Sequence, residues 1–313
     1  MAAGNHAQQR VVDLPAVPSL AGLYARQVPA ALTGAVGAVL PRRSRPADGL
    51  PGIAYRATGI RPDPARLTAF AHLVRAPGSD DLPPGYVHAL VFPVATALLA
   101  RDDVPLPLAG LVHLQNAWHQ RRPLTLASVL SVTTRVERLR AHRSGTLVDV
   151  VSEIADEADG GVAPPVAVDR STYLARGLRL PAADGTQETT SSPRAPFEPP
   201  VPTGQWRLGA DTGRRFAAVS GDWNPIHVSG PTARLLGMKG AIAHGMFTAS
   251  RGLATVRLPA AFHWDVAFAA PVRLPATVAV RVDGVPADPD GARFTGWNPR
   301  SGALHLTSTV TAA

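Results

Sequence analysis

The feature that most constrains the fold is an internal repeat, because two halves of the chain carry the same succession of patterns. Phe70-Ala71 aligns with Phe216-Ala217, and Pro123–Leu126 aligns with Pro271–Leu274, so the matched segments lie 146 and 148 positions apart. Similarity at a nearly fixed offset indicates two copies of one structural unit. With 313 residues, the chain is long enough for two units of ordinary domain size.

Each half begins with helical patterns and continues with alternating apolar and polar residues. Pro62–Val74 is predicted to be a short helix with Asp63 as its N-cap, and Tyr86–Ala100 is apolar on nearly every side, which indicates a buried helix that Pro93 kinks or begins. Alternation predicts strands in the first half at Leu111–Trp118, Ser128–Leu139, Thr146–Ile154 and Val166–Tyr173. In the second half it predicts them at Asp265–Ala270, Ala276–Asp283, Ala292–Trp297 and Leu304–Val310.

Composition divides the chain into four parts. Residues 1–54 are expected to form a poorly defined arm, partly helical and partly disordered, and its apolar run Val28–Leu40 is shorter than the roughly 20 residues of a membrane span. Residues 55–176 form the first predicted unit. Residues 177–205 are rich in Pro, Ser and Thr, which predicts a linker, and residues 206–313 form the second unit.

Charge and composition exclude several classes of function. The net charge is +8, but the basic residues are dispersed and aromatic residues make up only 5%, so we expect no binding to nucleic acid. A partner that carries phosphates or an acidic surface, such as coenzyme A or acyl carrier protein, fits the same charge. No cysteine is present, no histidine spacing is typical of a metal site, and no export signal is visible, so no cofactor or metal is expected and the cytoplasm is the default compartment.

One short stretch of the second half concentrates side chains that do chemistry. Asp222, Asn224 and His227 follow a predicted helix that Asp211 and Thr212 cap and that Gly221 ends, since glycine tolerates a positive φ. Pro225 biases the preceding residue towards an extended conformation. The three polar side chains are therefore expected on a turn rather than on the face of a helix.

A second helix is predicted to start near Gly245, after the small residues from Gly240 onwards. Free amide groups and the positive end of the helix dipole at such a start can hold and polarise a carbonyl oxygen. His244 is expected to shape this helix start and Met246 to belong to the core or to the wall of a tunnel. Trp223 is predicted either to cover a ligand or to pack against the protein.

These motifs resemble those of a known family. The run from Phe216 to His227, followed by Ala233 and by Ala243-His244-Gly245-Met246, is similar to the signature of the MaoC-like hydratases and dehydratases, which act on R-3-hydroxyacyl and 2-enoyl thioesters. The resemblance implies an α+β fold of the double hot-dog type, in which each unit wraps an antiparallel sheet around a long helix. It also implies a hydro-lyase whose partner is an acyl-CoA or acyl-carrier-protein thioester.

The resemblance also assigns roles to residues. It implies that Asp222 and His227 carry the acid–base chemistry, that Asn224 supports the site, and that the Gly245 amide donates to the thioester oxygen. The constant repeat offset places Ala76 opposite Asp222 and Asp81 opposite His227, so the first unit lacks the pair and is expected to be a degenerate copy.

Several alternatives stay open at this stage. A thioesterase on the same fold and an acyl-thioester binding protein without turnover are the other classes of function. The sequence does not decide which of Asp222 and His227 is the base, how long the acyl chain is, which carrier is used, or in which direction the reaction runs. A monomer and a homodimer are both compatible with a chain that already contains two units.

Overall fold

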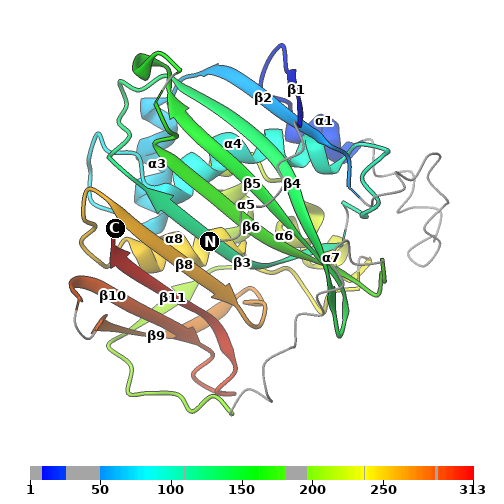
Figure 1. The fold of residues 1–313 in the computed structure, drawn as a ribbon. Helices are drawn as coiled ribbons and strands as arrows, with labels where there is room; N and C mark the ends of the chain where they lie inside the picture. Colours follow the sequence, from blue (N-terminus) through cyan, green and yellow to red (C-terminus); the bar gives the residue numbers. More distant parts are fainter. Residues whose placement is uncertain are drawn as a thin grey trace.

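The computed structural model describes residues 9–25, 50–108, 110–161, 163–180, 196–235, 237–285 and 288–313 (Figure 1). Its helices are α1 (Leu20–Ala25), α3 (Pro64–Val74), α4 (Pro84–Leu99), α5 (Thr212–Ser220), α6 (Pro225–Val228), α7 (Gly230–Leu235) and α8 (Gly245–Leu253). Its strands are β1 (Arg10–Asp13), β2 (Ile53–Ile60), β3 (Leu111–Gln120), β4 (Leu130–His142), β5 (Gly145–Asp156), β6 (Ala167–Arg176), β7 (Gly204–Leu208), β8 (Phe262–Phe268), β9 (Ala276–Val285), β10 (Asp288–Trp297) and β11 (Leu304–Ala312).

All eleven strands form one sheet, and its order displays the internal repeat. The strands follow one another as β1-β2-β4-β5-β6-β3-β8-β11-β10-β9-β7. Apart from β1 at one edge, the first half runs inwards as β2-β4-β5-β6-β3, and the second half runs inwards from the other edge as β7-β9-β10-β11-β8. Equivalent strands therefore occupy equivalent places. Each half is one hot-dog unit, and the mixed α+β fold is a double hot-dog, as the sequence predicted.

The two units join where β3 lies antiparallel to β8. Trp118 and Trp264 are partners in this register, and both are buried, with exposed fractions of 1% and 0%. The seam is therefore an ordinary pair of central strands and not an edge between two separate sheets. Trp264 also donates from Nε1 to Ser308 Oγ at 2.8 Å, which satisfies its buried polar atom.

The main helices lie on one face of the sheet (Figure 1). Helix α4 is buried along nearly its whole length, as its apolar sequence predicted, and Pro93 lies inside it rather than at its start. Helices α3 and α5 pack together, with the rings of Phe70 and Phe216 at 6.1 Å. A single apolar cluster includes residues from both halves, so the core is continuous across the repeat. Among the described residues, no helix is both long and apolar enough to cross a membrane.

Elements that depend on distant parts of the chain were missed by the sequence analysis. Strand β1, within the expected N-terminal arm, pairs in parallel with β2, and β7 pairs with β9. The predicted linker contributes its last two residues, Gly204 and Gln205, to β7. The run Val28–Leu40 and most of the predicted linker lie outside the described residues.

The predicted position of Asp81 within the repeat was wrong. Asp81 forms an isolated bridge with Thr125, and the same bridge in the second half joins Ile242 to Arg273. Asp81 is therefore equivalent to Ile242 and not to His227. The offset is not constant because the first half lacks the segment that holds α6 and α7. The first half therefore has no counterpart of His227, and Ala76 remains the residue opposite Asp222.

Candidate active site

Asp222 is positioned by the end of helix α5. Gly221 ends that helix in the left-handed conformation, with φ at 80°, and Asp222 follows at once. The Asp222 amide donates to Ser220 Oγ at 3.2 Å, and Asp222 Oδ1 accepts from the Asn224 amide at 3.2 Å. The carboxylate is thus part of the turn, with 17% of its side chain exposed.

Asn224 and His227 belong to a short helix that the sequence analysis had placed on a turn. Asn224 is the N-cap of α6, and its Oδ1 accepts from the Ile226 amide at 3.3 Å. His227 lies inside α6, is 9% exposed, and donates from Nδ1 to the Ile242 carbonyl at 2.9 Å. The prediction of a turn was wrong for His227 because Asn224 and the preset φ of Pro225 together start a helix.

Glycine at position 213 allows α5 to approach this helix closely. A Cβ atom on Gly213 would lie 1.9 Å from the His227 carbonyl oxygen, well inside van der Waals contact. The backbone of His227 is therefore packed directly against the first turn of α5. The same helix that presents Asp222 at its C-terminal end fixes His227 near its N-terminal end.

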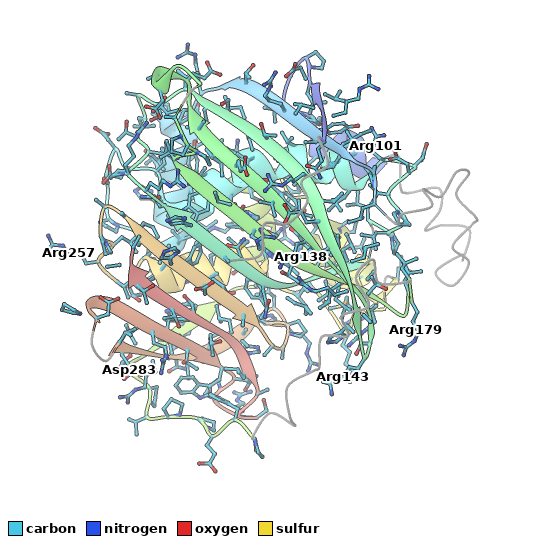
Figure 2. All side chains as sticks on the ribbon, viewed as in Figure 1. Arg101, Arg138, Arg143, Arg179, Arg257 and Asp283 are labelled. Carbon is cyan, nitrogen blue, oxygen red and sulfur yellow. The ribbon has the colours of Figure 1, made fainter. Side chains whose placement is uncertain are left out.

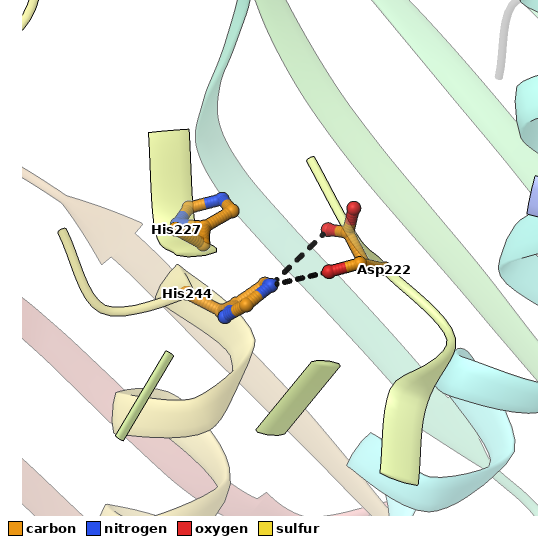
Figure 3. A group of neighbouring side chains, drawn as sticks. All are labelled: Asp222, His227 and His244. Carbon is orange, nitrogen blue, oxygen red and sulfur yellow. Dashed lines mark hydrogen bonds and ion pairs between the residues drawn. The ribbon is translucent and has the colours of Figure 1, made fainter. Parts of the chain in front are cut away.

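His244 closes the group from the other side (Figure 3). Its Nε2 donates to the Asp222 carbonyl oxygen at 2.9 Å and lies 3.6 Å from Asp222 Oδ2. Its ring stacks on that of His227, with centroids 3.7 Å apart and an interplanar angle of 24°. His244 is 4% exposed, so it joins Asp222 and His227 into one compact, mostly buried set.

Burial keeps both imidazoles neutral. It lowers the pKa of His227, although the Asp222 carboxylate and the hydrogen bond to Ile242 act in the opposite direction. Burial together with the adjacent His227 ring lowers the pKa of His244 to about 3. Because His227 donates from Nδ1, its Nε2 carries the free lone pair and is able to accept a proton at neutral pH.

Helix α8 begins beside this group. His244 is its N-cap and makes no capping hydrogen bond through its side chain, and Gly245 is its first residue, as the sequence predicted. The first amide groups of a helix have no acceptor within it, so they are available to an oxygen atom placed before the helix. A Cβ atom at Gly245 would lie 3.0 Å from the Phe268 ring, which explains why glycine suits this position.

The three side chains also have the spacing of a metal site, which the sequence analysis did not predict. One potential ligand atom from each of Asp222, His227 and His244 lies within 4.8 Å of the other two. Each imidazole already uses one nitrogen on a backbone carbonyl, which leaves one nitrogen per ring. For His244 that nitrogen is Nδ1, which is buried without a hydrogen-bond partner among the described residues, whereas the Nε2 that faces Asp222 is already used. The arrangement therefore suits proton transfer by Asp222 and His227 better than a metal ion held by all three side chains.

The remaining predicted residues have simpler surroundings. Met246 is 6% exposed and belongs to the apolar core, in agreement with one of its two predicted roles. Trp223 is 44% exposed, so it lies at the protein surface and is not part of the core. Its position beside Asp222 leaves the ligand-covering role as a prediction.

The first half contributes a buried polar network that the sequence analysis missed. His88 Nδ1 lies 2.6 Å from Asp169 Oδ2, and Asn116 donates to Asp169 Oδ1 at 2.6 Å. Sequence spacing showed no carboxylate near His88, because the two residues are 81 positions apart and meet only when α4 packs on β6.

This network reaches the candidate site through aromatic rings. The ring of His113 stacks on that of Tyr173 at 4.7 Å and lies 5.1 Å from that of Phe268, which in turn contacts Gly245. The negative charge of Asp222 contributes to the raised pKa of Tyr173, although burial is the main cause. The first half therefore forms part of the surroundings of Asp222.

Comparison with known proteins identifies a relative whose similarity extends over nearly the whole chain. A family model described as a MaoC-like domain matches residues 188–288. The 3-hydroxyacyl-thioester dehydratase X of Mycobacterium tuberculosis is 35% identical over 288 residues, which cover 89% of this chain and 95% of that protein.

Solved structures show the same similarity in three dimensions. The crystal structure of HtdX from Mycobacterium tuberculosis matches with a TM-score of 0.70 and 32% identity, over 83% of this chain and 100% of that one. A MaoC-like dehydratase from Phytophthora capsici matches with a TM-score of 0.62 over 83% of this chain and 94% of that one, at 21% identity. The second match supports the fold alone.

Proposed function

Since the chain belongs to the MaoC-like dehydratase family and is a hydro-lyase, we propose that it interconverts R-3-hydroxyacyl thioesters and trans-2-enoyl thioesters, with Asp222 and His227 as the acid–base pair. The observation that carries this proposal is the juxtaposition of that pair with the start of α8. A carboxylate, a neutral imidazole and free helix amides are the three elements needed to add water beside a polarised thioester.

The Gly245 amide is proposed to hold the thioester oxygen. Negative charge develops on this oxygen as the enolate forms, and the start of α8 stabilises that charge. One hydrogen-bond donor of this kind is worth about 3 kcal/mol of activation free energy. The absence of a side chain at Gly245 lets the substrate carbonyl approach the backbone.

Water is proposed to bind between Asp222 and His227. In hydration, the water oxygen adds to C3 of the enoyl thioester while one of its protons passes to one member of the pair. That proton passes through the pair to the other member, which delivers it to C2 on the same face, so one water adds across the double bond and both groups return to their starting states. Dehydration is the reverse. Because potential proton acceptors of the two residues lie within 4.8 Å of each other, either member can take the first proton from water.

His244 and Asn224 are proposed to position this pair. His244 holds the backbone of Asp222 and stacks on His227, so its neutral ring fixes the relative placement of the two reactive groups. Asn224 caps α6 and is held by the Asp222 carboxylate. Coenzyme A and acyl carrier protein are both proposed as carriers of the acyl group.

Turnover of defined substrates tests the proposal. Purified protein is mixed with crotonyl-CoA and with a medium-chain trans-2-enoyl-CoA, and the loss of the enoyl-thioester absorbance is followed. We expect absorbance to fall and the product to be refused by an S-specific 3-hydroxyacyl-CoA dehydrogenase. Tight binding without any turnover, on coenzyme A and on carrier-protein substrates alike, would instead identify a binding protein.

A further inference from the structure

A pocket lined by arginine side chains lies near the N-terminal end of helix α5, the end opposite Asp222. Its cavity of about 310 Å³ is lined by Arg75, Gln205, Arg207 and Arg251. A neighbouring cavity of about 160 Å³ shares three of these arginines and adds Arg215 and the residues where α5 begins. No acidic residue lines either cavity.

These arginines come from four different elements. Arg75 ends α3 in the left-handed conformation, with φ at 60°. Arg207 lies on β7, Arg215 on the first turn of α5, and Arg251 near the end of α8. Four like charges brought together by folding repel one another, so the arrangement favours an anion between them.

Arg251 forms the buried part of the pocket. It is 9% exposed, and its guanidinium carbon lies 5.0 Å from the ring centroid of Trp206. Its Nε is buried and has no hydrogen-bond partner among the described residues. Burial, and then the charge of Arg75, lower the pKa of Arg251 to about 10, which shows how poorly its charge is compensated.

Several half-buried arginines elsewhere in the structure have carboxylate partners. Arg101 pairs with Asp103 at 2.6 Å and Arg140 with Asp149 at 2.8 Å. Within the described part of the chain, no carboxylate oxygen lies within 4.0 Å of a guanidinium nitrogen of Arg75, Arg207, Arg215 or Arg251. What distinguishes this pocket is therefore that its uncompensated arginines are gathered around one cavity and that one of them, Arg251, is buried.

We propose that these four arginines and the start of α5 bind a phosphate group, either as a phosphate monoester or as a diphosphate. Planar guanidinium groups match phosphate oxygens in pairs, and a dianion engages more arginines than a carboxylate does. Amides at the start of a nine-residue helix add further donors and a positive dipole end.

The site is separate from the catalytic group. Helix α5 begins beside the pocket and ends just before Asp222, which places about 13 Å of helix between the two at 1.5 Å per residue. A phosphate in the pocket therefore does not touch the reacting atoms. The proposal rests on the pocket alone and stands whether or not the proposed reaction is correct.

Calorimetric titration of the full-length protein with inorganic pyrophosphate at low ionic strength tests the site. We expect saturable binding of one anion per chain. Arg75→Gln and Arg207→Gln remove exposed side chains, and each is expected to weaken binding about tenfold or more, because a charge-assisted hydrogen bond contributes about 1.5–3 kcal/mol.

Arg143→Gln is the matched control. Arg143 is exposed at the β4–β5 hairpin (Figure 2), it lines neither cavity, and its replacement makes the same change in net charge. Thermal melting establishes that each variant folds, and pyrophosphate is expected to raise the melting temperature of wild type and Arg143→Gln more than that of the pocket variants. The proposal is overturned if wild type shows no saturable binding, or if the pocket variants bind as the control does.

Further titrations distinguish the source of the phosphate. Inorganic phosphate, 4'-phosphopantetheine and pantetheine are compared on wild type and on Arg75→Gln. Binding of phosphopantetheine but not of pantetheine identifies a carrier-linked phosphate, whereas binding of inorganic phosphate alone identifies a free anion. Binding of pantetheine that is equally sensitive to Arg75→Gln would contradict recognition of a phosphate.

Discussion

At the scale of single residues, burial decides what the histidines can do. His227 and His244 are held neutral by desolvation, although a carboxylate lies close to both. A neutral His227 with Nδ1 hydrogen-bonded to a carbonyl presents a basic Nε2 at physiological pH. The folded protein therefore supplies a base without having to remove a proton from it first.

The same effect predicts how the protein responds to acid. His113 is half-buried on β3, and burial, then the nearby His88, lower its pKa to about 3. Below a pH of about 6.5 the unfolded chain binds a proton at this position that the folded chain does not, so stability present above that pH is lost as the pH falls. Between pH 7 and pH 5 this single group costs about 2 kcal/mol of unfolding free energy.

Urea unfolding at pH 7 and pH 5 checks this prediction with His113→Phe. The new ring keeps the aromatic contacts to Tyr173 and Phe268 but does not titrate. We expect the variant to lose about 2 kcal/mol less than wild type between the two pH values. His142→Phe, on the β4–β5 hairpin, is the control, and an equal pH dependence of wild type and His113→Phe would refute the prediction.

At the scale of elements, a prediction follows from Gly213, the residue at which α5 contacts the backbone of α6. Gly213→Ala places a methyl group 1.9 Å from the His227 carbonyl oxygen, so α5 and α6 must separate. We expect a loss of roughly 1–3 kcal/mol of stability and, because His227 moves, a loss of activity of about a hundredfold.

Gly230→Ala provides the comparison for that variant. Gly230 begins α7, and a Cβ atom there would have no heavy atom within 4 Å. Denaturant unfolding and steady-state rates are measured for both variants, and Gly230→Ala is expected to match wild type. If Gly213→Ala also matched wild type in both measurements, the close packing of α5 on His227 would contribute neither to stability nor to activity.

Helices whose ends are set by neighbouring residues were predicted from the sequence. A helix that is held by contacts with distant parts of the chain was not. Asp63 accepts from the Arg66 amide as the N-cap of α3, and Gly221 ends α5, both as expected from residue type alone. Helix α6 has only four residues and is held by the hydrogen bond of His227 to Ile242. No local pattern signals a helix that short, because its stability comes from tertiary contacts.

The residues of the candidate site also fall into a group that the sequence predicted and a group that it did not. Asp222, Asn224, His227 and Gly245 lie in two short stretches of one half, so their pattern is visible in the sequence. Tyr173, Phe268 and the buried pair of His88 and Asp169 are brought to the same region by the sheet. Their proximity depends on strand order and register, which an individual sequence does not reveal.

At the scale of the whole molecule, the two hot-dog units share one sheet and one core. Strand β8 has β3 of the other half as a neighbour, and the fully buried Trp264 lies in that pairing. A second unit alone would expose β8 as an apolar edge. The first half therefore completes the structure of the half that carries Asp222 and His227.

Cutting the chain between the halves tests this interdependence. A specific protease site is placed between residues 181 and 195, the stretch whose composition predicts a linker. After cleavage, we expect both fragments to elute together in size-exclusion chromatography under native conditions and to keep their activity. Elution as two separate folded fragments would show that the shared sheet does not hold the units together.

The measurement that tests the central claim most directly is the hydration rate of a trans-2-enoyl thioester by Asp222→Asn and by His227→Gln. Asp283→Asn serves as the control, because Asp283 is a surface residue paired with Arg281, remote from the site (Figure 2). We predict that each site variant melts as wild type does and loses several orders of magnitude in rate, while the control keeps full activity. A loss of less than tenfold in both folded site variants would contradict the assignment of Asp222 and His227 as the acid–base pair.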